Sequence, residues 1–161
     1  MRKEWVVCLL SLTLLGVCTQ ASAQNRSLEG YGYFGAHGSP GNFGDVLSVG
    51  VGADCFLYRG LAAGADVGYM FPRASGGNGI GLLSVNPSYH FVNKERTNRI
   101  VPFVTGGYGL AFRSGTANLA NFGGGATFWF IERVGFRFEV RNYRNTTDSF
   151  TTQFRFALAF R

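Results

Sequence analysis

Two short segments combine serine with histidine, the residue types that can supply a nucleophile and its base. They are His37-Gly38-Ser39 and Ser88-Tyr89-His90. Nucleophilic catalysis requires the hydroxyl group and the base to lie within hydrogen-bond reach of each other, so each segment is a candidate for hydrolytic chemistry. No metal-ligand spacing and no P-loop pattern occurs in the sequence. Hydrolysis is therefore the one catalytic chemistry to be tested against the elements that carry these residues.

A second group of chemistry-bearing residues is charged and lies within segments that alternate with period two. Arg137, Glu139 and Arg141 alternate with apolar residues, which places all three on one face of a strand. The same alternation is weaker in the earlier segments and is clear again in the last segment of the chain. Six charged residues follow the pattern: Asp54, Asp66, Arg137, Glu139, Arg141 and Arg155.

The elements that must position these residues are strands. After Val17 no stretch has a sustained 3.6-residue apolar period, whereas alternation with period two recurs up to the last residue. The chain has 24 glycines, 16 phenylalanines and 7 tyrosines but is only 15% charged, a composition rich in β-formers and turn residues. We predict strands at about 29–37, 45–57, 61–72, 79–92, 100–113, 117–131, 134–142 and 150–160. An even number of strands in an up-and-down meander places both termini at one end.

Gly30, Gly32 and Gly35 have the GxGxxG spacing of a dinucleotide site. That site requires a strand before the glycines and a helix after them, and the pattern predicts neither here. We interpret the three glycines as strand residues.

The first residues predict an export signal. Arg2 and Lys3 precede a short apolar stretch, and the Ala-Ser-Ala of residues 21–23 is the small-residue pattern that signal peptidase cuts. The apolar stretch is shorter than the ~20 residues that a spanning helix needs. We expect 1–23 to be a cleaved signal peptide and 24–161 to form one domain.

Alternation alone fits two barrels of opposite sense, a membrane barrel with a greasy outer face and a soluble, lipocalin-like barrel with a greasy interior. An eight-stranded barrel has room inside only for modest side chains or one small ligand. One face of the strands carries most of the Phe, Tyr, Leu and Val, and the other is mainly Gly, Ala, Ser, Thr and Asn, with too little charge for a surface in water. We therefore predict an all-β fold, an eight-stranded antiparallel up-and-down transmembrane β-barrel. Phe56 and Trp129 are exceptions on the inner face, and the phase of the first strand stays open.

The six charged residues fall on the inner face in this assignment. Buried charges persist only when they are paired, so we predict a salt-bridge network that fills and plugs the lumen, with a gated ion path as the alternative. Aromatic residues on the outer face gather near the strand ends, as interfacial girdles should. They are Phe91, Phe130 and Phe160 near one end and Tyr69, Phe71, Tyr108 and Phe112 near the other.

The sequence resembles the small outer-membrane barrels of the OmpA-barrel and OmpX type over the whole mature chain. The resemblance rests on the signal peptide, on Pro102-Phe103-Val104-Thr105-Gly106-Gly107-Tyr108-Gly109 and on the closing residues. These closing residues are Phe154, Phe156, Leu158 and Phe160, followed here by Arg161. The resemblance implies that the closing strand is an assembly signal for the barrel-insertion machinery. It also implies a location in the cell outer membrane, contact with its lipid, and a structural, envelope-maintaining or surface-interaction role.

The resemblance also bears on catalysis, because some small outer-membrane barrels are lipid A deacylases or acyltransferases. The deacylases carry His and Ser on a late strand with a partner carboxylate, unlike 37–39 and 88–90. We therefore predict no enzymatic activity, no catalytic residues, and no cofactor or metal. A lipid A-modifying enzyme and a soluble barrel that binds an apolar ligand are the alternatives.

Partners follow from the distribution of charge. The arginines are spread through strands and turns rather than clustered, so nucleic acid is not an expected partner. Arg73, Arg113 and Arg144 fall near the presumed outer end, and arginine forks match phosphate groups well. We predict that they contact lipopolysaccharide, with a solvated rim as the alternative. The sequence identifies no protein partner.

Overall fold

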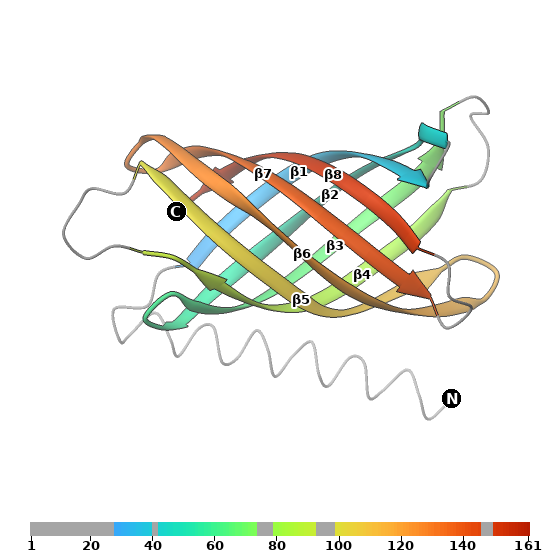
Figure 1. Ribbon diagram of the computed structural model, residues 1–161, viewed down its shortest axis with the longest axis horizontal. Helices are drawn as coiled ribbons and strands as arrows, with labels where there is room; N and C mark the ends of the chain where they lie inside the picture. Colours follow the sequence, from blue (N-terminus) through green and yellow to red (C-terminus); the bar gives the residue numbers. More distant parts are fainter. Residues whose placement is uncertain (1–27, 40–41, 74–78, 93–98, 146–149) are drawn as a thin grey trace.

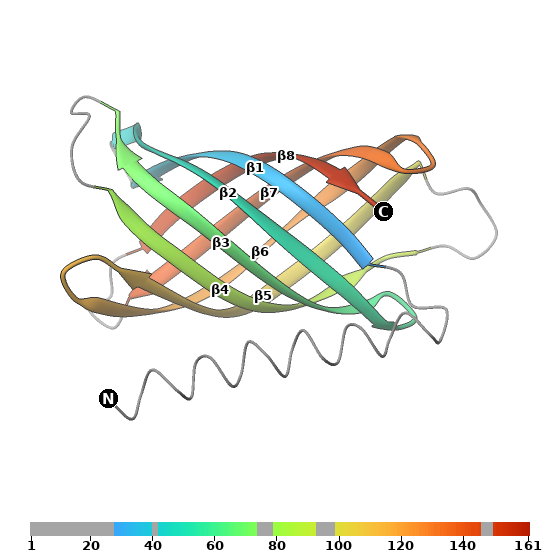
Figure 2. The ribbon, with the colours of Figure 1, turned by 180° about the vertical axis from the view of Figure 1, so that it is seen from behind.

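The structure, a computed structural model, describes residues 28–39, 42–73, 79–92, 99–145 and 150–161. These residues form a closed antiparallel barrel in which each strand pairs with the next and β1 also pairs with β8 (Figures 1 and 2). The strands are β1 (Leu28–Ser39), β2 (Asn42–Tyr58), β3 (Leu61–Pro72), β4 (Ile80–His90), β5 (Ile100–Phe112), β6 (Thr116–Ile131), β7 (Val134–Asn145) and β8 (Phe150–Phe160). The predicted eight-stranded up-and-down barrel is confirmed. The predicted signal peptide, 1–23, lies outside the described residues.

The two ends of the barrel differ in their connections. β1, β3, β5 and β7 end on the right in Figure 1, at what is here called the loop end; β2, β4, β6 and β8 end at the opposite, terminal end, where the C-terminus also lies. β1, β2, β6 and β7 reach further toward the loop end than the sequence predicts, whereas β3 and β8 reach it as predicted and β4 and β5 stop one residue short. β7 extends to Asn145 because Tyr143 pairs with Thr151 and Arg144 with Phe150 on β8. No helix among the described residues is long and apolar enough to cross a membrane.

The structure settles the phase of β1, which the sequence leaves open. Tyr31 and Tyr33 point into the barrel, and each is only 5% exposed. They pair with Gly52 and Gly50 of β2, where an added Cβ would lie 2.5 Å from the tyrosine rings. A glycine opposite an aromatic residue leaves room for the ring to lie across the neighbouring strand. The two glycines are therefore what allows two large rings inside a narrow barrel.

Glycine also brings β6 close to β7. A Cβ at Gly125 would collide with the backbone carbonyl oxygen of Phe138, and one at Gly123 with that of Val140. Both glycines face the lumen beside Glu139 and Arg141 of β7. Their missing side chains leave the interior volume to the long side chains of β7.

The connection between β2 and β3 is a tight two-residue turn in which only Gly60 is a residue type that favours positive φ. Arg59 and Gly60 both have positive φ, 41° and 86°, as a tight two-residue hairpin turn requires. The turn is held to the neighbouring hairpin by the backbone N–H of His90, which donates to the carbonyl of Gly60 at 2.7 Å.

The outer surface carries the large apolar side chains. Val67 and Val104, at mid-strand, expose 47% and 50% of their area, and Leu158 exposes 53%. This is the opposite of a lipocalin-like barrel, which would bury these residues around a ligand. Six of the seven predicted girdle residues are exposed and lie near the two ends of the barrel: Phe91, Phe130 and Phe160 at the terminal end, and Tyr69, Tyr108 and Phe112 at the loop end.

Candidate functional site in the barrel lumen

Asp66 of β3 is the centre of a polar network inside the barrel. It accepts hydrogen bonds from Arg141 Nη1 at 2.8 Å and Arg155 Nη2 at 3.2 Å, contributed by β7 and β8 across the lumen. The amide of Asn86 donates to the same carboxylate at 3.1 Å. All four side chains are buried, so the carboxylate is held by three donors where water does not reach it.

A second centre lies toward the terminal end. Arg137 Nη1 donates to Asp54 Oδ2 at 2.6 Å, and its Nη2 donates to Glu139 at 3.4 Å. Glu139 also accepts from Arg141 Nε, which joins the two centres. The structure thus brings together all six charged residues that the sequence places on the inner face, and none of them is more than 3% exposed.

Aromatic rings enclose two of the guanidinium groups. Arg137 lies over the ring of Tyr31 at 4.4 Å and over that of Phe103 at 4.0 Å. Arg155 lies over Tyr33 at 4.3 Å. Cation–π contacts of this kind strengthen when water is excluded, so these rings compensate the arginines for part of their lost hydration.

Several members of the network are not predicted from the sequence. Glu29 approaches Arg137 Nη1 at 3.9 Å, and the Tyr143 hydroxyl accepts from Arg155 Nη2 at 2.6 Å. Gln153 accepts from Arg155 Nε at 2.7 Å and donates to Ser48. Glu29 could not be predicted because the sequence does not decide which face of the first strand points inward. Gln153 lies on the charged face of a strongly alternating strand, so the same alternation could have identified it.

Ser88 and His90 are within hydrogen-bond distance, but their geometry is not that of a catalytic triad. Ser88 Oγ lies 3.1 Å from His90 Nε2, and the nearest carboxylate, Asp54, approaches the same nitrogen at 3.8 Å. A triad requires the carboxylate on the other ring nitrogen, Nδ1, which has no hydrogen-bond partner among the described residues. His90 is 1% exposed and packed against the rings of Phe56 and Phe103. A substrate would have no access to this pair.

The segment 37–39 likewise shows no assembled nucleophile and base. His37 is buried at the loop end, with its ring stacked on Tyr143 at 6.5 Å between centroids. The side chain of Ser39 lies outside the described part of the structure. Within that part, no group of three His, Cys, Asp or Glu side chains is placed to hold a metal ion.

The two inner-face exceptions have local explanations. Phe56 packs its ring edge-on against His90, with centroids 4.7 Å apart. Trp129 fills the terminal end above Gly135, where an added Cβ would lie 2.9 Å from the indole. The Arg161 guanidinium covers the indole at 4.2 Å and donates to the carbonyl of Glu132 at 2.6 Å. Arg161 thus has a structural place at the closing end of β8.

The remaining predicted site residues lie on the surface. Arg73, Arg113 and Arg144 are exposed at the loop end, where Arg144 lies over the ring of Phe150 at 5.3 Å. The four closing residues, which are Phe154, Phe156, Leu158 and Phe160, project from the outer face of β8. The rings of Phe154 and Phe156 lie beside the ring of Phe138 on β7.

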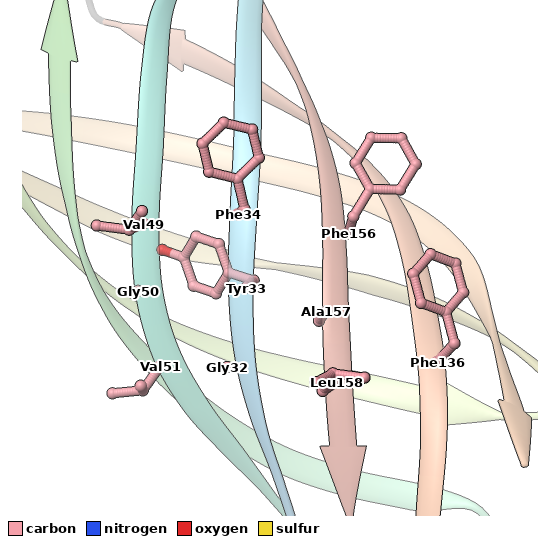
Figure 3. A pocket seen from close by; sticks show the side chains of 10 residues that line it. All are labelled: Gly32, Tyr33, Phe34, Val49, Gly50, Val51, Phe136, Phe156, Ala157 and Leu158. Carbon is pink, nitrogen blue, oxygen red and sulfur yellow. The ribbon is translucent and has the colours of Figure 1, made fainter.

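An apolar groove runs along the outer surface over β1 (Figure 3). Its floor is Gly32, around whose missing side chain there is open space. Val49 and Val51 of β2 flank it on one side and Phe156 and Leu158 of β8 on the other, and Phe34 lies further along β1. The groove has a volume of 620 Å³. Its lining is almost entirely apolar.

The sequence matches no protein-family model and no curated protein, but solved structures share its fold. The N-terminal β-barrel domain of Pseudomonas aeruginosa OprF has a TM-score of 0.64 at 16% identity, covering 85% of this chain and 98% of that one. Neisserial surface protein A has a TM-score of 0.56 at 11% identity, covering 85% and 99%. The outer membrane enzyme PagL has a TM-score of 0.50 at 17% identity, covering 83% and 99%. The chain therefore has the fold of small outer-membrane barrels, as the resemblance implied.

Proposed function

We propose that this protein is an integral outer-membrane barrel with a structural, envelope-maintaining or surface-interaction role, and that its charge network closes the lumen. The observation that carries the proposal is the sidedness of the barrel. Large apolar side chains cover the outside, while the six charged side chains of the lumen network are buried and paired. In hydrocarbon every backbone polar group needs a partner, and a closed barrel leaves no strand edge unpaired.

The content of the lumen supports a closed barrel rather than a pore. Arg137, Arg141, Arg155, Phe103 and Leu82 are among the largest fully buried side chains. Eight strands enclose an interior that side chains can fill. A continuous water path would require the arginines to leave their carboxylates, and a buried charge without its partner is costly.

The proposal is tested on cells that express the full-length chain, with two readouts on the same protein. It is expected in the outer-membrane fraction, and its gel mobility is expected to change on boiling, because a closed barrel resists detergent until it is heated. In planar bilayers the purified barrel is expected to show no stable, large conductance. A soluble protein without a mobility shift would contradict the membrane location, and a large steady conductance would contradict the closed lumen.

A contact with lipopolysaccharide is part of the surface role that we propose. Arg73, Arg113 and Arg144 are exposed at one end of the barrel, and arginine forks match phosphate groups well. Binding of the purified barrel to lipopolysaccharide is expected to weaken as salt is raised, because exposed charges are screened. Binding that does not respond to salt would count against this contact. The outward-facing residues of β8 support the proposal that the insertion machinery reads this strand during assembly.

The enzymatic alternative has no specific observation in its favour. The likeness to PagL extends to the fold alone, and the Ser88–His90 pair lacks both triad geometry and access. We therefore propose a non-enzymatic role.

A further inference from the structure

Two adjoining cavities lie inside the barrel at its loop end, beyond the charge network. Their volumes are 230 and 300 Å³, and they share His37, Met70 and Thr151 in their walls. Ligand pockets for drug-sized molecules span about 300–1,000 Å³. The cavities therefore fit a small molecule rather than a phospholipid or a peptide.

The walls of the inner cavity divide by strand into an apolar and a polar side. Residues of β3 to β6 form the apolar side: Met70, Leu82, Ala111, Ala117 and Leu119. Residues of β1, β7 and β8 form the polar side: His37, Tyr143, Asn145 and Thr151. A molecule that matches both sides must have an apolar part and one polar head.

The polar side offers hydrogen-bond donors that the network does not use. His37 is 4% exposed, and its Nε2 atom has no hydrogen-bond partner among the described residues. The Tyr143 oxygen accepts from Arg155, which leaves the hydrogen of the phenol as a donor. Arg155 Nη1, buried next to this bond, also lacks a partner among the described residues. Buried polar groups without partners are costly, so a ligand that supplies acceptors would satisfy these donors.

The charge around the cavities selects the head group. Arg113 lines the outer cavity and Arg155 lies beneath Tyr143, and among the described residues of the two walls there is no aspartate or glutamate. An ammonium group would meet hydrogen-bond donors and two arginines there. A carboxylate would instead meet the donors of His37 and Tyr143 and the positive charge of the two arginines.

We propose that the loop-end cavities bind a small monocarboxylic acid with an apolar tail. Its carboxylate lies against His37 and Tyr143, with Nε2 of His37 carrying the hydrogen, and its tail lies along Leu82 and Leu119. This binding activity goes beyond the structural role proposed above and does not depend on it, because the cavities belong to the barrel interior.

Octanoate is a suitable probe, with the full-length barrel held in phospholipid nanodiscs. Equilibrium dialysis against radiolabelled octanoate, with empty nanodiscs as the blank, is expected to show one saturable site in the barrel. Octylammonium of the same length is expected to show none. The chain has two histidines, so a sample with isotope-labelled histidine gives two ring signals. Octanoate is expected to shift that of His37 and not that of His90, which lies at the terminal end.

Variants locate the site. Ala117→Phe fills the apolar side and is expected to abolish saturable binding, whereas Ala120→Phe, on the exposed face of the same strand, is expected to leave it unchanged. His37→Leu removes a hydrogen bond to a charged group and is expected to weaken binding by about tenfold. Equal uptake by empty nanodiscs, equal binding of octylammonium, or unchanged binding in Ala117→Phe would each overturn the proposal, with the heat-dependent mobility shift verifying that each variant is folded.

Discussion

Replacement of Asp66 by alanine is expected to lower the free energy of unfolding by about 3–5 kcal/mol, the usual cost of removing one partner from a buried ion pair. Asp66 neutralises Arg141 and Arg155, both of which are 1% exposed. Without the carboxylate, two guanidinium groups stay in the lumen with too few acceptors and no route to water. Urea-dependent unfolding of the barrel in phospholipid vesicles measures the loss as a lower midpoint.

Two matched variants show whether the charge is the cause. Asp45→Ala removes the same residue type from an exposed position and is expected to change stability by less than about 0.5 kcal/mol. Asp66→Asn keeps the shape and one acceptor but loses the charge, so its loss should lie between the other two. If Asp66→Ala were as stable as Asp45→Ala, the network would be a consequence of the fold and not a contributor to its stability.

The strands could be predicted because local chemistry and the fold agree along most of the chain. In β7 and β8, apolar residues alternate strictly with charged or small residues. Each side chain therefore fits only one face of the barrel, the outer face or the lumen. A one-residue slip would move Arg137 and Glu139 into the apolar surface. β3 begins and ends where the sequence predicts, between the Arg59–Gly60 turn and Arg73.

The inner face of β1 could not be predicted from the sequence because it is determined by residues of another strand. Tyr31 and Tyr33 alternate with glycines, which are compatible with either face. Their direction depends on Gly50 and Gly52 of β2, which provide the space for the rings. That space can be recognised only when the pairing register of β1 and β2 is known. The same register places Glu29 on the inner face, together with Tyr31 and Tyr33.

The network could be predicted as a set but not as a list of pairs. Alternation places a residue on the inner face, whereas its partner depends on how strands distant in sequence are staggered around the barrel. Arg155 meets Asp66 across 89 positions of sequence, and Arg137 meets Asp54 across 83. The loop-end cavities depend on the same stagger, which brings His37 of β1 opposite Leu82 of β4.

Replacement of Val67 by arginine is expected to destabilise the barrel by about 2–4 kcal/mol in a bilayer, the cost of a cation on the lipid face near mid-depth. Val67 lies near the middle of β3, points outward and is flanked by Val51 and Leu83 on the paired strands. An arginine there would have to reach the interface past apolar neighbours. The same urea titration in phospholipid vesicles measures the effect.

The position of the substitution separates a membrane barrel from a soluble one. Ile131→Arg places the same cation at the terminal end, where the side chain is 63% exposed, and is expected to cost only about 0–1 kcal/mol because the interface solvates it. A barrel whose outer face contacted water would tolerate arginine equally well at both positions. Equal stability of the two variants would therefore contradict the assignment of the apolar face to lipid, while a difference that grows with depth would measure the solvent that this face contacts.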